Sequence, residues 1–509
     1  MPILHWLTRS ADIEAASQVQ YRVLEEVDSL HYGDKNSDNL LIQGDNLDAL
    51  KALLPYYAGQ VKCIYIDPPY NTGHAFEHYD DNVEHSQWLS LMYARLELLW
   101  QFLQEGGSIW IQIDDDEFAY MKVICDELFG RKSFIASSIW QKRTSPDARL
   151  NLGAAHEYIL VYGKNAQFTR DNFNLLTATS KTLSQYKNPD NDPRGPWAST
   201  DFTGQAGHAT PDQFFTIISP TGKKHTPPPG RCWALAPRTF EQLQNEGRVW
   251  FGKDGNAKPR LKRYLTEAGG VAAWTWWTNQ EVGHYQESKK EIITLFGEAI
   301  FDTPKPERLI ERIIHIASNP GDLVMDTFLG SGTTAAVAHK MGRRYIGVEM
   351  GEHCVTHCQP RLVKVVDGEQ GGISKSQNWQ GGGGFRFYRL GAPLFNEEGL
   401  ISREVTFKNL SAHIWFSETY SPIATGRTDT SAILGVHDDV AYVVLHPESS
   451  STEVLTSVVL RKLKDELELQ GYSEVKKIVV YGESCRMGDD RLREQGVVFK
   501  QIPYDVKAR

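Results

Sequence analysis

The sequence predicts an α/β protein in which a parallel sheet, covered by helices on both faces, is interrupted by a long inserted segment. Short apolar runs typical of strands alternate with runs in which apolar residues recur at helical spacing. Such alternation is typical of parallel sheets. It is lost between about residues 165 and 290, where Pro, Gly, Asn and Trp are frequent, and it resumes beyond them. We therefore expect one sheet built from two separated halves of the chain.

The first half of the expected sheet lies before residue 165. Residues 11–30 have helical character, and a strand at 40–43 leads through a turn at Gly44-Asp45-Asn46 into an amphipathic helix. The elements expected after that helix are, in order, a strand within 61–70, a helix at 88–103, a strand at 108–114, a helix at 121–129 and strands at 133–142 and 156–164.

The second half resumes near residue 306. Its expected elements are a helix at 306–318, a strand at 322–326, a helix at 332–342 and a strand at 343–349. Four glycines at 381–384 are typical of a linker or a turn. After them, a small separate α/β unit is indicated by runs with strand or helix spacing at 440–448, 455–468 and 476–483.

Composition and charge restrict the classes of function. The 509 residues are 41% hydrophobic and 23% charged, which is typical of a globular protein of several domains. The sequence has no bilayer-spanning apolar run and no signal-peptide pattern, and its six cysteines are scattered, so we expect a cytoplasmic protein with no membrane segment. The net charge of −10 argues against nonspecific coating of nucleic acid but allows a local basic surface.

The first candidate site follows the strand within 61–70, which ends in Asp67-Pro68-Pro69-Tyr70. Asp67 supplies a hydrogen-bond acceptor where the strand ends. Because proline has no N–H, we expect the Pro68 carbonyl to be held outward as a second acceptor. Tyr70 adds a flat face for stacking. Two acceptors and a stacking surface suit a flat ring bearing an amino group, such as an adenine or cytosine extruded from a nucleic-acid helix.

The second candidate site begins at Asp326, where another strand ends, and continues through a glycine-rich turn at 330–332 into a helix. Glycines there allow a ligand to approach the backbone closely. Glu349 ends the next strand, where a carboxylate is suited to the ribose hydroxyls of a nucleoside cofactor. A plain strand–helix turn is the other interpretation of these glycines. Since parallel strands end at one edge of a sheet, we expect Asp67, Asp326 and Glu349 to share a pocket.

Together these two motifs, DPPY and DTFLGSGTT, resemble the amino-methylating DNA methyltransferases that use S-adenosyl-L-methionine. DPPY precedes the glycine turn, with the variable region between them, and this order is similar to the permuted β class of these enzymes. The segments HEYILVYGK, NPDNDPRGPW, FDTPKP and GRRYIGVE are similar to the modification subunit of type III restriction–modification systems and its solitary relatives. The resemblance covers roughly residues 20–395.

The resemblance implies a Rossmann-like methyltransferase fold and divides the chain into four segments. These are a first methyltransferase part at 1–165, a target-recognition domain at 166–295, a second methyltransferase part at 296–390 and a C-terminal α/β domain at 391–509. It also implies catalytic roles for Asp67, Pro68, Pro69 and Tyr70. The cofactor-binding residues that it implies are Asp45, Thr303, Lys305, Asp326, Phe328, Gly330, Ser331, Gly332, Thr333 and Glu349.

The implied activity is transfer of a methyl group from S-adenosyl-L-methionine to the 6-amino group of adenine in double-stranded DNA, after base flipping. Within the resemblance, Asp at the first DPPY position favours adenine over cytosine. Methylation of the cytosine 4-amino group, a non-catalytic DNA-recognition subunit and an RNA methyltransferase remain alternatives. The implied partners are a second copy of the chain and a helicase–nuclease restriction subunit.

A basic stretch in the inserted segment is the candidate DNA surface. Residues 222–263 hold ten Lys or Arg residues against three acids, with Trp233, Trp250 and Phe251 among them. A charged face turned to solvent is the alternative interpretation, but the position of this stretch within the insertion favours phosphate and base contacts. The predicted DNA contacts are Lys142, Arg143 and Arg149 in an earlier loop, and Lys223, Lys224, Arg231, Lys253, Arg260, Lys262 and Arg263.

No metal site is expected. The HCVTHC segment at 353–358 places histidines and cysteines at helical spacing, but no second ligand pair follows at zinc-finger spacing. The tryptophans of the WTWW cluster at 274–277 are expected in the core rather than at a base-stacking surface.

Overall fold

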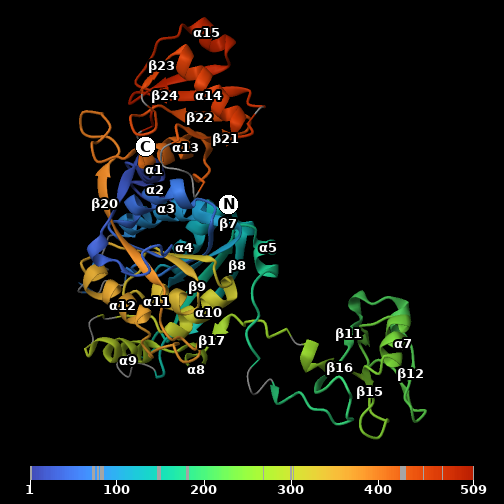
Figure 1. Cartoon of the computed structure of the whole chain (residues 1–509). Coiled ribbons are helices and arrows are strands. Elements are labelled where there is room, and N and C mark those ends of the chain that lie inside the picture. The colour runs from blue at the N-terminus through green and yellow to red at the C-terminus, as the bar shows by residue number, and fades with distance from the viewer. Residues whose placement is uncertain are drawn as a thin grey trace. The chain divides into compact units, whose positions relative to one another are not determined.

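The chain, as a computed structural model, forms two compact units, Met1–Phe173 with Trp274–Arg509, and Asn174–Ala273. The structure describes residues 3–71, 75–76, 79–80, 85–145, 151–178, 183–267, 269–298, 301, 303–424, 431–450, 452–472 and 474–507. Figure 1 shows the elements of both units.

The larger unit is built on an eleven-stranded sheet in the order β1-β20-β3-β19-β18-β4-β7-β9-β8-β17, with β2 paired to β20. The strands are β1 (Arg22–Glu26), β2 (Tyr32–Gly33), β3 (Leu40–Gln43), β4 (Val61–Ile66), β7 (Leu103–Ile113), β8 (Phe134–Gln141), β9 (His156–Gly163), β17 (Trp276–Trp277), β18 (Leu323–Asp326), β19 (Arg344–Glu349) and β20 (Gly384–Pro393).

The centre of this sheet is parallel, as the alternation of strands and helices predicts. β3, β19, β18, β4 and β7 run in one direction, with Met325 opposite Ile64 and Glu349 opposite Gln43. Strands from the two halves of the chain are therefore direct neighbours. Because all five run the same way, their carboxyl ends lie at one edge, and the segments after β4 and β18 emerge side by side. The mixed, mainly parallel α/β fold is confirmed.

Helices cover both faces of the sheet (Figure 1). On β4, Ile64 and Ile66 pack into the core shared with the helices from the first half, whereas Cys63 and Tyr65 alternate to the opposite face. The helices of the larger unit up to β20 are α1 (Arg9–Gln18), α2 (Asn46–Tyr57), α3 (His85–Phe102), α4 (Phe118–Cys125), α5 (Ala166–Asp171), α8 (Asn279–Val282), α9 (Tyr285–Phe296), α10 (Glu307–Ala317), α11 (Thr333–Lys340) and α12 (Gln359–Val366).

Two local expectations are wrong. The helix expected over residues 11–30 ends at Gln18, and β1 follows it, because pairing with β20 outweighs the local helical preference of this stretch. Of the two interpretations of the glycines at 381–384, the linker between domains is wrong, because Gly384 begins β20, a ten-residue strand of the main sheet.

The C-terminal part of the larger unit has its own four-stranded sheet, in the order β21-β22-β24-β26. β22, β24 and β26 are parallel, and α13 packs against α2 of the main layer. This part therefore has the expected α/β arrangement. Its elements are α13 (Phe407–Thr419), β21 (Ile433–His437), β22 (Val440–Val444), β23 (Val454–Leu455), α14 (Ser457–Leu469), β24 (Lys477–Gly482), β25 (Ser484–Cys485), α15 (Asp489–Glu494) and β26 (Val497–Gln501).

The smaller unit is mostly antiparallel and has a compact aromatic core of Phe202, Ile217, Trp233, Phe240 and Phe251. The smaller unit spans fewer residues than the predicted segment 166–295, because α5, α8 and α9 belong to the larger unit. Its elements are β10 (Trp197–Thr200), β11 (Thr203–Gln205), β12 (Ile217–Ile218), β13 (Lys224–His225), β14 (Arg231–Trp233), α7 (Pro237–Asn245), β15 (Val249–Trp250) and β16 (Arg260–Tyr264).

In the part of the chain that the structure describes, no helix combines the length and the apolar character needed to cross a bilayer.

Candidate functional site

A cavity of about 650 Å³ lies at the carboxyl edge of the parallel strands. Asp67, after β4, and the glycine turn after β18 line the same cavity, so the two candidate sites form one site. Its lining residues are Tyr65, Asp67, Pro68, Pro69, Tyr70, Asp114, Lys142, Arg143, Thr144, Ser145, Glu157, His284, Tyr285, Gln286, Lys289, Phe301, Thr303, Lys305, Asp326, Phe328, Leu329, Gly330, Ser331, Thr333 and Thr334.

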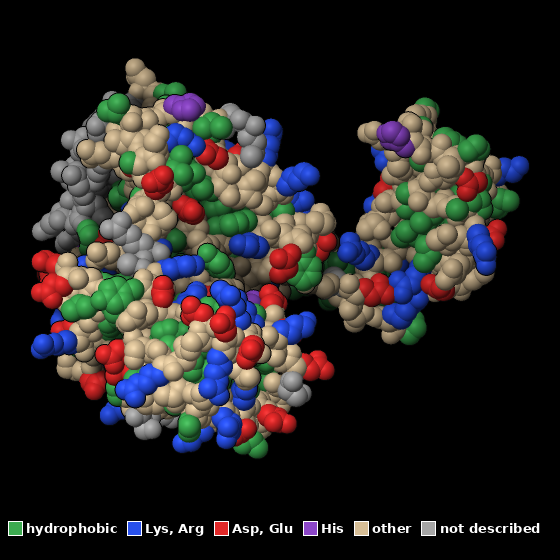
Figure 2. Space-filling view, turned by 90° about the horizontal axis from the view of Figure 1, so that it is seen from above, with side chains coloured by type: hydrophobic (Ala, Val, Ile, Leu, Met, Phe, Trp, Pro, Cys, Tyr) green, Lys and Arg blue, Asp and Glu red, His purple; other side chains and the backbone are tan. Residues whose placement is uncertain are grey.

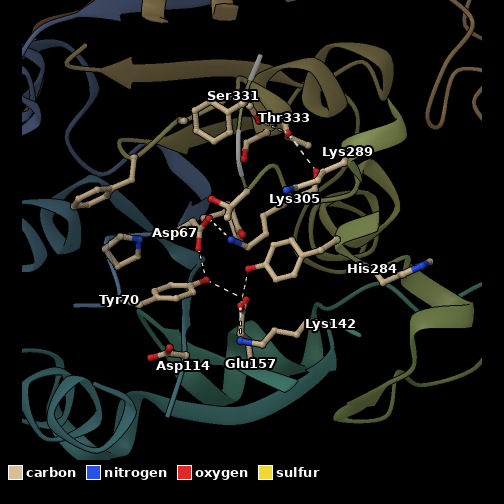
Figure 3. A pocket seen from close by; sticks show the side chains of 18 of the residues that line it. Asp67, Tyr70, Asp114, Lys142, Glu157, His284, Lys289, Lys305, Ser331 and Thr333 are labelled. Carbon is tan, nitrogen blue, oxygen red and sulfur yellow. Dashed lines mark hydrogen bonds and ion pairs between the residues drawn. The ribbon is translucent and has the colours of Figure 1, made fainter. Parts of the chain in front are cut away.

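Asp67 lies at the centre of this cavity and uses both carboxylate oxygens (Figure 3). The Tyr70 hydroxyl donates to Oδ1 and the Lys305 ammonium donates to Oδ2. Burial raises the pKa of Asp67 above its ordinary value, the nearby Glu157 raises it further, and Lys305 opposes both. Asp67 is therefore a partly buried acceptor whose negative charge is offset mainly by one ammonium group.

The carbonyl oxygens of Pro68 and Pro69 differ in their hydrogen-bond partners. The Trp88 indole donates to the Pro69 carbonyl at 2.7 Å. The Pro68 carbonyl has no donor among the residues that the structure describes. This arrangement leaves an acceptor beside Asp67, as the missing N–H groups of the dipeptide predict.

Glu157 on β9 is a second carboxylate in the cavity. It accepts hydrogen bonds from the Tyr70 hydroxyl at 3.0 Å, the Tyr285 hydroxyl at 2.6 Å and the Gln112 amide at 2.6 Å, and it pairs with Lys142 at 3.2 Å. Lys305, Lys142 and these hydrogen bonds outweigh burial and lower the pKa of Glu157. A buried carboxylate with this many donors stays ionised.

The glycine turn between β18 and α11 has the backbone freedom that the sequence predicts. Gly330 and Gly332 both have left-handed φ values, of +56° and +79°. A Cβ on Gly332 would lie in ordinary van der Waals contact with the Cα of Cys358, at 3.4 Å, so it is the positive φ that disfavours a side chain at this position. The turn therefore follows its tight path because both positions are glycine.

Asp326 lies just before this turn, buried at the cavity wall. The Phe328 amide donates to its Oδ1 at 2.9 Å, and burial raises the pKa of Asp326 to about 7. The Thr334 hydroxyl and the Phe328 amide are hydrogen-bond donors to Asp326, but no cation is among the groups that set its pKa, so this buried carboxylate favours a ligand that brings positive charge to it.

A buried ion network supports the turn from beneath. The Arg361 guanidinium donates to the Thr333 hydroxyl at 2.8 Å and to the Ser331 carbonyl at 3.2 Å. The same guanidinium donates to Glu307 at 2.9 Å, and Lys340 donates to Glu307 at 2.7 Å. These contacts hold the pKa of Glu307 below its ordinary value, although burial acts in the opposite direction. Arg361 thus ties the turn to a buried cluster of ion pairs around Glu307.

Two predicted cofactor residues lie behind the cavity wall. Asp45 caps α2 by accepting from the Leu47 amide at 2.8 Å and pairs with Arg95 at 2.9 Å. Glu349 accepts from the Gly330 amide at 2.6 Å. Neither side chain lines the cavity, in contrast to the predicted shared pocket for Glu349. In this structure Glu349 holds the turn in place.

Of the remaining predicted cofactor residues, all but Gly332 line the cavity. Thr303, Phe328, Ser331 and Thr333 line it. Lys305, predicted to bind the cofactor carboxylate, lines it as well but pairs with Asp67. Lys305 therefore links the cofactor side of the cavity to the acceptor side.

The loop cations predicted to contact DNA have different positions. Lys142 and Arg143 line the cavity mouth, and Lys142 is paired with Glu157. Arg149 lies outside the described residues. His284 and Lys289, at the start of α9, also line the cavity, so this rim carries basic groups from two segments of the chain.

In the smaller unit the predicted DNA contacts form three groups. Lys223, Lys224, Lys253 and Arg263 are exposed. Arg231 and Arg260 donate to the backbone and hydroxyl oxygens of neighbouring strands. Lys262 is 8% exposed and paired with Asp190 and with Asp192. Because these acids hold its ammonium inside the unit, we leave Lys262 out of the proposed DNA contacts.

The aromatic residues among these cations belong mainly to the fold. Trp233 and Phe251 are core residues of the smaller unit. On the visible face in Figure 2, the Lys and Arg side chains are interspersed with Asp and Glu. In the WTWW cluster Trp277 is buried as expected, whereas Trp274 is 75% and Trp276 52% exposed, so the expectation of a core position is wrong for these two tryptophans.

The HCVTHC segment forms a π-helical turn at Cys354–Cys358 that leads into α12, and its residues have packing roles. His353 contacts Glu349 at 3.1 Å, and the Cys358 thiol donates to the Gly330 carbonyl. Within the described part of the chain, one group has metal-ligand geometry, at Glu26, Asp28 and His31 on the surface.

Glu157 and Tyr285 are the site residues that sequence reasoning missed. The signal for Glu157 was present, because a lone acid stands in the otherwise apolar strand His156–Gly163. Tyr285 gave no comparable signal, since it lies in a region without periodicity and meets Glu157 only through the tertiary fold.

The larger unit combines a mainly parallel α/β sheet with the DPPY tetrapeptide and a glycine turn at one cavity. This is the arrangement expected from the resemblance to the amino-methylating DNA methyltransferases. Residues 61–359 match the family described as DNA methylase, and this match covers more than half of the chain. The chain belongs to the DNA methylase family.

Three relatives illustrate the range of this similarity. The chain is 37% identical over 335 residues to the Mod subunit of the type III restriction–modification enzyme StyLTI of Salmonella typhimurium, a match of 59% of this chain and 50% of the relative. It is 32% identical over 432 residues to the probable HindVI Mod subunit of Haemophilus influenzae, covering 72% and 55%. It is 25% identical to the DNA adenine methyltransferase YhdJ of Escherichia coli, covering 67% and 92%. The chain thus spans about half the length of the two Mod subunits.

Proposed function

We propose that this chain transfers a methyl group from S-adenosyl-L-methionine to the 6-amino group of adenine in double-stranded DNA, after the base has been flipped into the cavity. The observation that carries the proposal is that Asp67 and the glycine turn line one cavity. An acceptor for an amino group and a cradle for a nucleoside cofactor are therefore close enough for one transfer reaction.

The cavity fits the proposed cofactor. Asp326 is a buried carboxylate whose raised pKa favours a positively charged ligand. Phe328 supplies an aromatic face, and Ser331, Thr333 and Thr303 supply hydroxyl groups. The left-handed Gly330 leaves room for a ligand against the backbone. When bound, S-adenosyl-L-methionine supplies an electrophilic methyl group on a sulfonium sulfur.

Asp67 and the Pro68 carbonyl act on the target amine. The lone pair of an aryl amine is delocalised into its ring and is a poor nucleophile. Two acceptors that bind both N–H groups favour a pyramidal nitrogen with a directed lone pair. They also stabilise the positive charge that develops on this nitrogen during transfer. The methylated nitrogen then loses one proton readily, so a dedicated strong base is not needed.

Lys305 must change partner, or share Asp67, when a base enters, because both oxygens of Asp67 already accept hydrogen bonds. Tyr70 presents its ring to the cavity beside Asp67, where it can stack on the flipped base. Positioning of the two reactants can contribute on the order of 7 to 11 kcal/mol to the rate enhancement.

The smaller unit is proposed as the target-recognition domain. The exposed Lys223, Lys224, Lys253 and Arg263 would contact phosphates, and Arg143 would contact DNA beside the flipped base. A homodimer, a helicase–nuclease restriction partner and a cytoplasmic location complete this proposal. They rest on the similarity to type III Mod subunits.

The test is a labelled-methyl transfer assay with unmethylated bacterial DNA, followed by digestion to nucleosides and identification of the modified one. We expect the modified nucleoside to be N6-methyl-2′-deoxyadenosine. If the label is found on cytosine, cytosine rather than adenine is the substrate. If RNA is labelled in preference to DNA, RNA is the substrate. No transfer to any of these substrates by a folded protein that binds the cofactor would contradict the proposal.

A further inference from the structure

The proposed chemistry assigns no role to Glu157, yet this carboxylate accepts hydrogen bonds from four separate segments of the chain. It is 1% exposed and lies on β9. Its donors come from four separate segments: Tyr70 after β4, Gln112 on β7, Lys142 after β8, and Tyr285 at the start of α9. Residues from both sides of the inserted segment therefore meet at one carboxylate (Figure 3).

The Tyr70 hydroxyl bridges Glu157 and Asp67. It hydrogen-bonds to Asp67 and lies 3.0 Å from Glu157 Oε2. The hydroxyl has one hydrogen and two anionic acceptors, so its position is set by both carboxylates. Because the hydroxyl is rigidly attached to the ring, Glu157 helps to hold the outer end of the Tyr70 side chain at the cavity.

Glu157 adds negative charge next to Asp67. Lys305, Lys142, Tyr285 and Gln112 keep the pKa of Glu157 low despite its burial. Its charge in turn raises the pKa of Asp67. The charged and titratable groups that face Asp67 are Lys305, Glu157, Tyr70, Tyr65, Tyr285 and Asp326.

We propose that Glu157 is a positioning residue for methyl transfer, which holds the hydroxyl end of Tyr70 and supplies a second negative charge near Asp67, where the target nitrogen becomes positive. This inference rests on the proposed function. A carboxylate at this position stabilises developing positive charge without touching the base, since it acts through Tyr70 and through the local field.

A carboxylate with similar donors outside the cavity provides a control that distinguishes a positioning role of Glu157 from a purely structural one. Glu418 accepts from the Tyr481 hydroxyl at 2.9 Å and from Lys500 at 2.7 Å, so it has the same kinds of donor as Glu157. It lies on α13 and does not line the cavity. Glu418→Gln therefore reports the cost of neutralising such a group far from the chemistry.

The experiment compares Glu157→Gln, Glu418→Gln and the unmodified full-length chain. We expect Glu157→Gln to lower kcat on the order of 10²-fold, with cofactor affinity unchanged. Loss of the neighbouring negative charge lowers the pKa of Asp67, so the acidic limb of the rate profile should move to lower pH. Glu418→Gln should leave both kcat and this limb as they are.

Tyr70→Phe is the second variant, because it keeps the ring and removes only the bridge. It should also lower kcat, but Asp67 loses a hydrogen bond that lowers its pKa, so the acidic limb should move to higher pH. Opposite shifts in the two variants are not expected from a loss of packing alone.

The results that overturn the inference are defined separately from failure of the proposed function. If the unmodified chain transfers no methyl group, the proposed function fails and the inference fails with it. If it does, a folded Glu157→Gln protein with unchanged kcat and acidic limb overturns the inference alone. Should Glu157→Gln unfold in thermal denaturation, an unchanged kcat in Tyr70→Phe overturns it.

Discussion

Two carboxylates of the cavity, Asp67 and Asp326, and Asp192 of the smaller unit have opposite electrostatic environments. In the smaller unit Asp192 accepts from Arg194 at 2.9 Å, Lys262 at 2.8 Å and Tyr264 at 2.7 Å, and these donors hold its pKa well below the ordinary range. In the cavity, burial raises the pKa of Asp67, and it raises that of Asp326 to about 7.

The comparison of Asp192 with Asp326 teaches that two buried carboxylates can differ in pairing, and that the one without a cation is suited to a positively charged ligand. Asp192 has as many strong donors as it can use, so its charge stabilises the fold. Asp326 has the desolvation cost of burial without a cation to offset it, and a positively charged ligand can relieve that cost. Four variants test this contrast between the cavity and the smaller unit.

The largest effect is expected from Asp67→Ala. This variant removes the acceptor for the target amine, so methyl transfer should fall by at least about 10³-fold. Cofactor binding, measured by isothermal titration calorimetry, should largely persist, because the glycine turn is untouched. Asp28→Ala, on an exposed surface turn, is the control and should keep full activity. Full activity in Asp67→Ala would remove Asp67 from the mechanism.

Asp192→Ala should affect stability rather than chemistry. It leaves Arg194 and Lys262 without their shared acceptor, although Asp190 still pairs with Lys262. We expect local opening of the smaller unit to become easier by about 2 kcal/mol. Amide hydrogen exchange in the full-length chain measures this change in residues 174–273.

Glu246→Ala is the control for this variant. Glu246 pairs with Arg248 at the surface of the same unit, so its removal should change the opening free energy by less than about 0.5 kcal/mol. Equal protection from exchange in Asp192→Ala and Glu246→Ala would show that the Asp192 network does not hold the unit together.

Much of the main sheet could be predicted from the sequence, because its signals are local. Apolar periodicity indicated strands 61–66 and 323–326, and parallel strand ends converge at one edge. These two facts place Asp67 and Asp326 together without any knowledge of packing. β20 could not be predicted in the same way, since its preceding glycines also suit a linker and its strand state depends on pairing with β1 and β3.

Side-chain partners inside the site could not be predicted from local signals. Lys305 was predicted at the cofactor, but its ammonium meets Asp67 only once both halves of the sheet are assembled. Glu157 stood out as an acid within an apolar strand, yet its donors come from four distant segments. In the smaller unit, neighbouring cations such as Lys262 and Arg263 have opposite exposure, because residues alternate across a strand.

The third variant, Lys253→Gln, tests the exposed cations of the smaller unit. If Lys253 contacts a phosphate, its loss should weaken DNA binding about fivefold and reduce the slope of log affinity against log salt by about 1. Fluorescence anisotropy with labelled duplexes at several salt concentrations measures both quantities. Lys35→Gln, an exposed lysine of the larger unit, is the control. An unchanged slope for Lys253→Gln would place this lysine away from DNA.

The smallest effect is a pH dependence of cofactor binding through Asp326. The pKa of Asp326 in the folded chain is raised to about 7, so its contribution to folding stability is present at low pH and is lost as the pH rises through about 7. Binding of a cation has the opposite dependence, because only the ionised carboxylate attracts it.

The affinity for S-adenosyl-L-methionine should therefore increase about threefold between pH values of about 6.5 and 7.5, over which the ionised fraction of a group with this pKa triples. Calorimetric titrations at the two pH values measure the change. Asp326→Asn, which has the same shape but no charge, should bind more weakly and show a flatter dependence. A steep dependence that persists in Asp326→Asn would assign the titration to another group, and the contrast between Asp326 and Asp192 would lose its functional meaning.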